Sequence, residues 1–263
     1  MKPIAELSAH EAGAIRFVLF DIDDTITEDG LLLRQSYNAL WDLRQAGICA
    51  IPVTGRPAGW CDLIARQWPV SGVVGENGAF ALYMEEGKLK RLLHPKAPEP
   101  SATRTKLTEL KRAALEAFPG LRVAKDQDFR LFDLALDFAE EQPDLGLPLA
   151  GRVKDFCQAN GAVAKVSSIH VNAWYGDYDK LSMSEHFLSS RFGFDPIIDK
   201  CSLLYVGDSP NDEPMFKHFP LSCGVSNIAR YKEIIQNLPQ FVTEKPFGYG
   251  FAEVVRVLLN LIA

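Results

Sequence analysis

The sequence has neither an excess of positive charge nor a long apolar run. Its 263 residues carry 28 Lys and Arg against 34 Asp and Glu, a formal net charge of −6. A nucleic-acid-binding protein needs a basic face, so we expect no nucleic-acid partner. No apolar stretch approaches the length of a bilayer span, and Met1–Ala14 carries charges where a signal peptide would have an apolar core. We therefore expect no membrane partner and a cytoplasmic location.

Cysteine is scarce and forms no recognisable motif. The five cysteines are scattered, odd in number and never spaced as CxxC. This pattern predicts reduced, mostly buried thiols in a reducing compartment. The apolar share of 47% and the charged share of 24% match globular proteins and exclude disorder, collagen and coiled coil. The length allows one large domain or two modest ones.

Several apolar runs end abruptly in polar residues. Runs that are apolar on both faces are typical of parallel strands covered by helices on each side. Two helices are predicted between the first three runs, one from about Leu33 that stops at Gly47 and one over Ala58–Gln67. The sequence therefore predicts an α/β doubly wound parallel sheet, with a local irregularity at Pro52. The predicted strands are Phe17–Phe20, Ile48–Val53, Gly72–Val74, Leu203–Val206 and Leu221–Val225.

The middle of the chain has a different pattern of apolar and polar residues. A hairpin is predicted over Phe80–His94, and prolines then mark a linker. Amphipathic helices and strands of alternating polarity follow, with Phe132–Phe138 as a half-buried strand. We predict an inserted α+β domain, residues 95–178, whose sheet has one apolar and one polar face. The core domain would then comprise residues 1–94 and 179–263.

Acidic residues follow two of the predicted strands. Asp21 and Asp23 come after the first, and Asp208 and Asp212 after the fourth. The carboxyl ends of parallel strands meet at one edge of a sheet, so these groups are expected in one crevice. Buried carboxylates repel each other and need a compensating cation or proton, and oxygen ligands favour a hard ion such as Mg²⁺. Taken singly, each cluster is also compatible with an Asp-rich turn or a helix cap.

Two further features suit a phosphate group. Thr54-Gly55 offers a hydroxyl and a backbone N–H close to a helix start, although a plain N-cap would look the same. Lys180 stands at another predicted helix start. A lone lysine is usually a solvated surface group, but a lysine among carboxylates would neutralise them and screen a phosphate dianion.

Together these segments resemble the four motifs of the haloacid dehalogenase superfamily. They are DIDDT (21–25), VTGRP (53–57), DK (179–180) and GDSPND (207–212), in the family's order. The insertion between the second and third motifs is similar to a type C2 cap, which characterises subfamily IIB. With the ENGA segment (76–79), it resembles the Cof-type, sucrose-phosphatase and mannosyl-3-phosphoglycerate-phosphatase branch.

The resemblance implies a role for each matching residue. Asp21 would be the nucleophile that forms an aspartyl-phosphate, and Asp23 the general acid and base. Mg²⁺ would be bound by the Asp21 and Asp208 carboxylates and the Asp23 carbonyl oxygen. Where many members have Gly, this chain has Asp24, which we expect to tolerate an unusual backbone angle. The phosphate would be held by Thr54, Gly55, Lys180 and Asn211, with Asp212 supporting the metal ligands.

The polar face of the cap is the expected place for specificity. Its polar and aromatic side chains would suit a phosphorylated sugar, although each residue singly could merely be solvated. The leading interpretation is a Mg²⁺-dependent phosphatase, a phosphoric monoester hydrolase acting on a small phosphate ester. A phosphomannomutase-type phosphomutase and a non-catalytic phosphosugar-binding regulator are the alternatives, and a homodimer is left open. The candidate substrate residues are Arg56, Lys165, His170 and Asn172.

Overall fold

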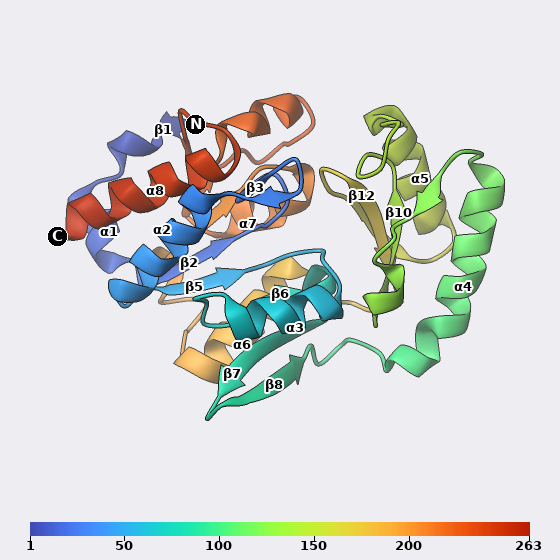
Figure 1. Ribbon diagram of the computed structural model, residues 1–263, viewed down its shortest axis with the longest axis horizontal. Coiled ribbons are helices and arrows are strands. Elements are labelled where there is room, and N and C mark those ends of the chain that lie inside the picture. Colours follow the sequence, from blue (N-terminus) through green and yellow to red (C-terminus); the bar gives the residue numbers. More distant parts are fainter.

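The computed structural model describes all residues 1–263 and has a larger and a smaller lobe (Figure 1). The larger lobe is built on a six-stranded sheet in which every neighbouring pair is parallel. The predicted α/β class with a parallel sheet is therefore confirmed. In spatial order the strands are β1 (Lys2–Pro3), β15 (Phe241–Val242), β14 (Leu221–Gly224), β13 (Leu203–Gly207), β2 (Phe17–Phe20) and β5 (Cys49–Pro52).

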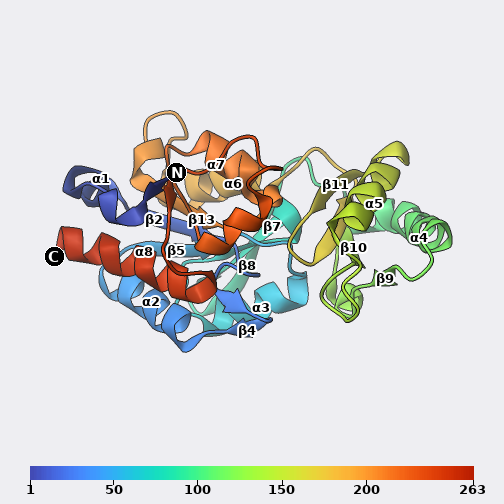
Figure 2. The ribbon, with the colours of Figure 1, turned by 90° about the horizontal axis from the view of Figure 1, so that it is seen from above.

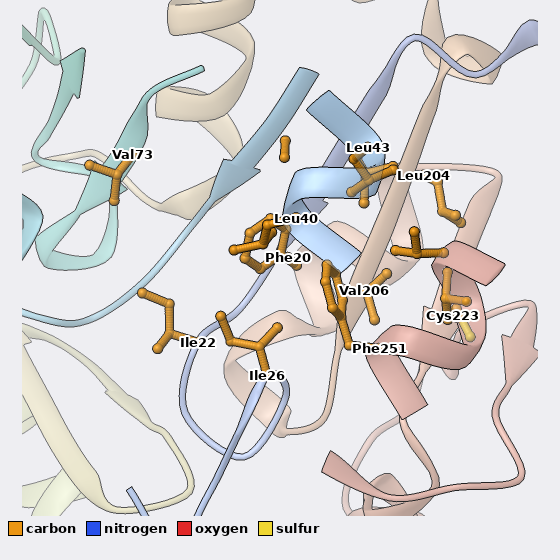
Figure 3. Packing of buried hydrophobic residues seen from close by; sticks show 14 of the residues in the cluster. Phe20, Ile22, Ile26, Leu40, Leu43, Val73, Leu204, Val206, Cys223 and Phe251 are labelled. Carbon is orange, nitrogen blue, oxygen red and sulfur yellow. The ribbon is translucent and has the colours of Figure 1, made fainter. Parts of the chain in front are cut away.

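Helices cover both faces of this sheet, as the apolar runs require. Val18 and Phe20 of β2 belong to one apolar cluster, and Phe17 and Leu19 belong to another. Figure 3 shows Phe20 in the first cluster, together with residues of α2 and α8. The helices beside the first cluster are α1 (Ala9–Ala14), α2 (Arg34–Gln45), α3 (Ala58–Gln67) and α8 (Phe247–Ile262), and those beside the second are α6 (Lys180–Phe192) and α7 (Glu213–His218).

The third predicted strand does not extend the main sheet. It is β6 (Val73–Gly75), which pairs antiparallel with β7 (Phe80–Glu85) in a separate sheet, and β7 pairs in turn with β8 (Lys88–Leu93). The main ladder ends at Pro52, and a single parallel bridge from Val53 to Val74 continues it. Proline has no N–H to donate, so the expected irregularity falls here. A short hairpin of β3 (Thr27–Glu28) and β4 (Leu31–Leu32) follows the first strand.

The smaller lobe is an antiparallel sheet with two helices on one face (Figure 2). Apolar side chains from the sheet and from both helices form its own core. Chain segments 94–99 and 175–179, which lie outside regular elements, connect it to the larger lobe. The predicted domain limits at 94/95 and 178/179 stay predictions. Its elements are α4 (Pro100–Ala117), β9 (Arg122–Val123), β10 (Asp133–Asp137), α5 (Leu147–Ala159), β11 (Val163–Val166) and β12 (His170–Trp174).

The prediction of Phe132–Phe138 as a half-buried strand was wrong. Every residue of β10 and β12 is buried. Asp133 of β10 faces the larger lobe, where Asn77 donates a hydrogen bond to it. Arg130, which precedes β10, donates one to the carbonyl of Gly55. Alternation along the strand showed two faces of different polarity, but it could not show that the polar face is covered.

The remaining regular structure consists of short 3₁₀ turns, two of which carry motif residues. No helix is both long and apolar enough to cross a membrane. All five cysteines are free thiols, and three of them are buried. The turns are Ile4–Glu6, Glu76–Gly78, Gln127–Phe129, Lys200–Ser202, Pro210–Asp212 and Ser226–Tyr231.

Candidate active site

The predicted motif residues converge at the carboxyl edge of the main sheet. β2 and β13 are neighbours in register, with Phe20 opposite Val206. Asp21 and Asp208 follow these strands directly, and the Asp21 N–H donates to the Val206 carbonyl. Residues 187 positions apart in the sequence are therefore brought together by strand pairing alone.

Three buried carboxylates form a group that fits a cation. Oxygens of Asp21, Asp208 and Asp212 lie within 4.8 Å of one another. Oδ1 of Asp208 accepts a hydrogen bond from the Thr25 hydroxyl at 3.0 Å, whereas its Oδ2 is buried without any partner. A buried carboxylate oxygen without a donor is costly, and a hard divalent ion would satisfy it.

Asp212 differs from the other two because each of its oxygens already accepts two hydrogen bonds, whereas each oxygen of Asp21 has one donor. Its Oδ1 accepts from Lys180 at 3.0 Å and from the Tyr205 hydroxyl at 2.6 Å. Its Oδ2 accepts the backbone N–H groups of Asp208 and Ser209. Asp212 therefore fixes Lys180 and the turn after β13 in place, which leaves Asp21 and Asp208 as the carboxylates open to a metal ion.

Lys180 is the cation of this acidic group. Asp179 caps the N-terminus of α6 and accepts the N–H of Ser182, which places Lys180 at the first helical position. Its Nζ lies 3.1 Å from Asp21 Oδ2 and 3.0 Å from Asp212 Oδ1. Burial alone would lower the pKa of Lys180, but the two carboxylates raise it above its ordinary value. The side chain is 5% exposed, so it is a fixed positive charge inside the site.

Burial sets the protonation of the acids. It raises the pKa of Asp21 to about 7; Lys180 opposes this shift, and Asp212 and Asp23 add to it. The pKa of Asp208 is raised well above its ordinary value, first by burial and then by Asp212 and Asp21. Carboxylates that resist ionisation when packed together indicate a site that is completed by a positive charge.

This protonation gives an expected dependence of stability on pH. Asp21 binds its proton more tightly in the folded than in the unfolded metal-free protein, so stability is greatest below the unfolded pKa of 3.8 and falls as pH rises through about 7. In EDTA, we expect the free energy of unfolding to fall by about 1–3 kcal/mol between pH 5 and pH 7. Urea titrations at several pH values measure it, and Asp21→Asn should have a shallower slope. An equal slope in that variant would contradict the assignment.

Thr54 and Gly55 form a narrow backbone turn beside the acids. Thr54 is fully buried, and its hydroxyl oxygen accepts the backbone N–H of Arg56 at 3.0 Å. A Cβ on Gly55 would lie only 3.2–3.3 Å from the amide groups of Asn77 and Asn172. Gly55 therefore allows both lobes to approach the turn closely. Asn211 is nearly buried in the Pro210–Asp212 turn, where it accepts a hydrogen bond from the Ser209 hydroxyl.

Asp23 lies at the edge of the acidic group, paired with Arg56. The guanidinium donates to both carboxylate oxygens of Asp23 at 2.7–3.1 Å, and on its other side it donates to Glu140 of the smaller lobe at 2.7 Å. It also stacks over the Trp60 ring at 4.3 Å. Burial opposes the charge of Arg56, but Asp23 and Glu140 raise its pKa above the ordinary value. Arg56, predicted as a substrate residue, thus joins Asp23 to the smaller lobe.

The backbone of Asp24 adopts the left-handed conformation that the sequence suggested. Its φ is +56°, and its carbonyl accepts a hydrogen bond from the Asn227 side chain. Asp tolerates this region better than most residues with a Cβ. The angle turns the chain sharply after Asp23, so that the segment returns to β3.

The other candidate substrate residues fall into two groups. His170 and Asn172 are buried in the contact between the lobes, where His170 Nε2 lies 2.8 Å from Glu140 and Asn172 donates to Asp133. Lys165 lies on the edge strand β11, opposite Asn172 in register, and is exposed. Only Lys165 therefore has a side chain free in solvent.

The sequence did not predict the ionic network that joins the lobes. Glu76 is fully buried and accepts the N–H groups of Ala58 in the larger lobe and of Leu131 and Phe132 in the smaller one. Burial, with the nearby Asp133 charge, raises the pKa of Glu76 to about 7. The residue stands in a motif, but nothing in the motif identifies its partners.

Arg130 is the central cation of this network, and no sequence signal pointed to it. Its buried guanidinium binds Asp126 and Asp133 of its own lobe and the Gly55 carbonyl of the other. Because it donates to the backbone of the turn after Thr54, the smaller lobe contacts the candidate phosphate-binding segment directly.

The fold and this arrangement of acids define the class of protein. The chain has the fold of the haloacid dehalogenase superfamily. A solved HAD/COF-like hydrolase from Plasmodium vivax has a TM-score of 0.69 at 16% identity, covering 97% of this chain and 100% of that one. The sucrose-phosphatase of Synechocystis has a TM-score of 0.61 at 14% identity, covering 92% and 97%. A subclass IIB sugar phosphatase of the superfamily has a TM-score of 0.62 at 13% identity, covering 94% and 99%.

Two curated relatives match along nearly the whole chain. The phosphoglycolate phosphatase of Methanospirillum hungatei is 26% identical over 255 residues, covering 92% of this chain and 96% of its own. That of Staphylothermus marinus is 23% identical over 258 residues, covering 94% and 98%. No protein-family model matches the chain. The solved structures confirm the predicted fold, and the two curated relatives support the predictions of the haloacid dehalogenase superfamily and of an enzyme of the phosphatase class.

Proposed function

We propose that the protein is a Mg²⁺-dependent phosphatase that hydrolyses a small phosphate monoester through an aspartyl-phosphate at Asp21. The observation that carries the proposal is the position of Asp21. It belongs to one buried cluster with Lys180, 3.1 Å away, and with Asp208, one oxygen of which has no partner. Phosphoryl transfer needs mainly positioning and charge neutralisation, and this cluster offers both.

In the first step, Asp21 attacks phosphorus and the ester bond to the alcohol breaks. Lys180, the Thr54 hydroxyl and the Gly55 N–H hold the negative oxygens of the phosphoryl group. Asp23, at the edge of the acidic group, must carry a proton in this step although Arg56 binds both of its oxygens, and it gives that proton to the departing alcohol oxygen. A carboxylate nucleophile divides one difficult displacement into two easier ones.

In the second step, water replaces the enzyme carboxylate on phosphorus. Asp23, now ionised, takes a proton from the water, which attacks phosphorus and releases inorganic phosphate with free Asp21. Arg56 holds both oxygens of Asp23, so it fixes the direction in which the carboxylate points. The proton taken from water returns Asp23 to its protonated starting state.

The acidic group fits the proposed Mg²⁺. The Asp21 and Asp208 carboxylates and the Asp23 carbonyl oxygen would hold the ion, and Asp212 would orient its neighbours. When bound, the ion would supply positive charge that offsets the repulsion among the carboxylates and between Asp21 and the phosphate. Oxygen-only donors are the set that Mg²⁺ prefers.

A phosphate-release assay tests the proposal. With Mg²⁺, the purified protein should hydrolyse p-nitrophenyl phosphate and at least one member of a panel of sugar phosphates, and EDTA should abolish the activity. Dependence on a bisphosphate activator, with transfer back to the sugar, would identify the phosphomutase alternative. Tight phosphosugar binding without phosphate release over hours would favour the non-catalytic regulator instead.

The substrate class, the cellular location and the oligomeric state are further parts of the proposal. A sugar phosphate is our first choice, since two structural neighbours are named as sucrose-phosphatase and sugar phosphatase. The curated relatives are named for phosphoglycolate. The cytoplasmic location and a homodimer stay predictions from the sequence.

A further inference from the structure

A large polar cavity opens beside Asp23, between the two lobes. Its volume is about 450 Å³, and Asp23 and Arg56 line it. A segment of the larger lobe that contains Asp24 and Asp29 forms one wall, and the segment of the smaller lobe from Ala139 to Asp144 forms another. If Asp23 protonates the alcohol oxygen, as the proposed function requires, the rest of the alcohol extends past Asp23 into this cavity.

The wall of the cavity carries an unbalanced negative charge. Asp23 and Glu140 are paired with Arg56. Asp24, Asp29 and Asp144 also line the cavity, and none of them forms a salt bridge.

A single free cation faces these three carboxylates. Arg230 is exposed and lines the same cavity, where its guanidinium lies 5.4 Å from the Phe247 ring centre and forms no salt bridge. One arginine does not balance three unpaired carboxylates, so the space that receives the alcohol has an excess of negative charge. A carboxylate placed there is repelled, and an ammonium group is attracted.

We propose that this cavity selects phosphate monoesters whose alcohol part carries an ammonium group, such as an amino alcohol or an amino sugar, over those whose alcohol part carries a carboxylate. The inference rests on the proposed function. It predicts that the chain differs in preference from phosphatases that act on phosphoglycolate, although two relatives have that name.

Three substrates of nearly equal size test the charge alone. They are phosphoethanolamine with an ammonium group, 2-hydroxyethyl phosphate with a hydroxyl, and 2-phosphoglycolate with a carboxylate. We expect kcat/KM to fall in this order, with about a tenfold difference between the first and the last at low salt. Raising the NaCl concentration should shrink the difference, because the carboxylates at the mouth are exposed to screening.

Substitution of the wall assigns the effect to named residues. In the double variant Asp29→Asn/Asp144→Asn, the ratio of kcat/KM for phosphoethanolamine to that for phosphoglycolate should fall to within about threefold of unity. Asp42→Asn is the control; it removes an exposed charge on α2 and should leave the ratio unchanged.

Each outcome decides one of the two proposals. If phosphoglycolate is the fastest substrate, or if the ratio of kcat/KM for phosphoethanolamine to that for phosphoglycolate is unchanged in the double variant, the charge selection is wrong. A specific loss of phosphoglycolate turnover in Arg230→Gln would show that Arg230 binds the substrate carboxylate, which would also overturn the proposed charge selection. Hydrolysis of p-nitrophenyl phosphate without the expected order refutes this inference alone, whereas no hydrolysis of any ester refutes the proposed function and this inference with it.

Discussion

Replacement of Asp21 by Asn is expected to lower kcat by at least about a thousandfold, with p-nitrophenyl phosphate and with every accepted natural ester. An amide cannot attack phosphorus, and the remaining groups can only bind and polarise the substrate. The side chain keeps its size, and its single amide oxygen can still accept from either Lys180 or the Ile22 N–H, which bind different oxygens of Asp21. Steady-state kinetics under saturating Mg²⁺ measure the effect.

Two controls separate chemistry from folding in this experiment. The far-ultraviolet circular dichroism of Asp21→Asn should match that of the parent protein. Asp42→Asn, which removes an exposed charge remote from the pocket, should keep full activity. A residual activity above about a tenth of the parent value in Asp21→Asn would contradict a nucleophilic role.

Replacement of Lys180 by Met is expected to affect both activity and stability. The loss of a buried cation leaves Asp21 and Asp212 uncompensated, which should cost about 3–5 kcal/mol in the free energy of unfolding. It also removes a charge that holds the phosphoryl group, so kcat should fall by about a hundredfold or more. Urea unfolding and phosphate-release assays measure the two effects.

A second substitution shows whether these effects have separate causes. Adding Asp212→Asn to Lys180→Met removes one of the stranded carboxylates, so part of the lost stability should return while activity stays low. Lys88→Met, at the exposed start of β8, is the matched control and should change neither quantity. If Lys180→Met is as stable and as active as that control, Lys180 has no part in the site.

The main elements of the fold could be predicted because strands that are buried on both faces appear in the sequence as continuous apolar runs. β2 is apolar on both faces, and its residues divide between two apolar clusters, as covered parallel strands require. β6 runs parallel to the end of β5, as predicted, but only a single bridge joins it to the main sheet, and its antiparallel pairing with β7 could not be predicted from an apolar run. The regular ladder of the main sheet ends at Pro52, and only the bridge from Val53 to Val74 follows it. Which strand pairs with the free edge of β6 depends on the rest of the structure.

The candidate site was predictable in part for a similar reason. Asp21, Asp208 and Lys180 could be placed together, since strand ends and a helix start fix their backbone positions. The contacts of the smaller lobe could not be placed, because they depend on how it lies against the larger one. Arg130, which reaches the Gly55 carbonyl, and Glu76, which binds backbone groups of both lobes, carry no periodic signal that predicts their partners.

The most direct measurement asks whether phosphorus becomes bonded to Asp21. The enzyme is mixed with Mg²⁺ and a rapidly hydrolysed ester, quenched in acid within milliseconds and treated with borohydride, which reduces an acyl phosphate to the corresponding alcohol. Mass spectrometry of the digested protein should then find homoserine at position 21, and only when both substrate and Mg²⁺ were present. Rapid turnover with position 21 unmodified at every quench time, or with the modification at another carboxylate, would contradict the account.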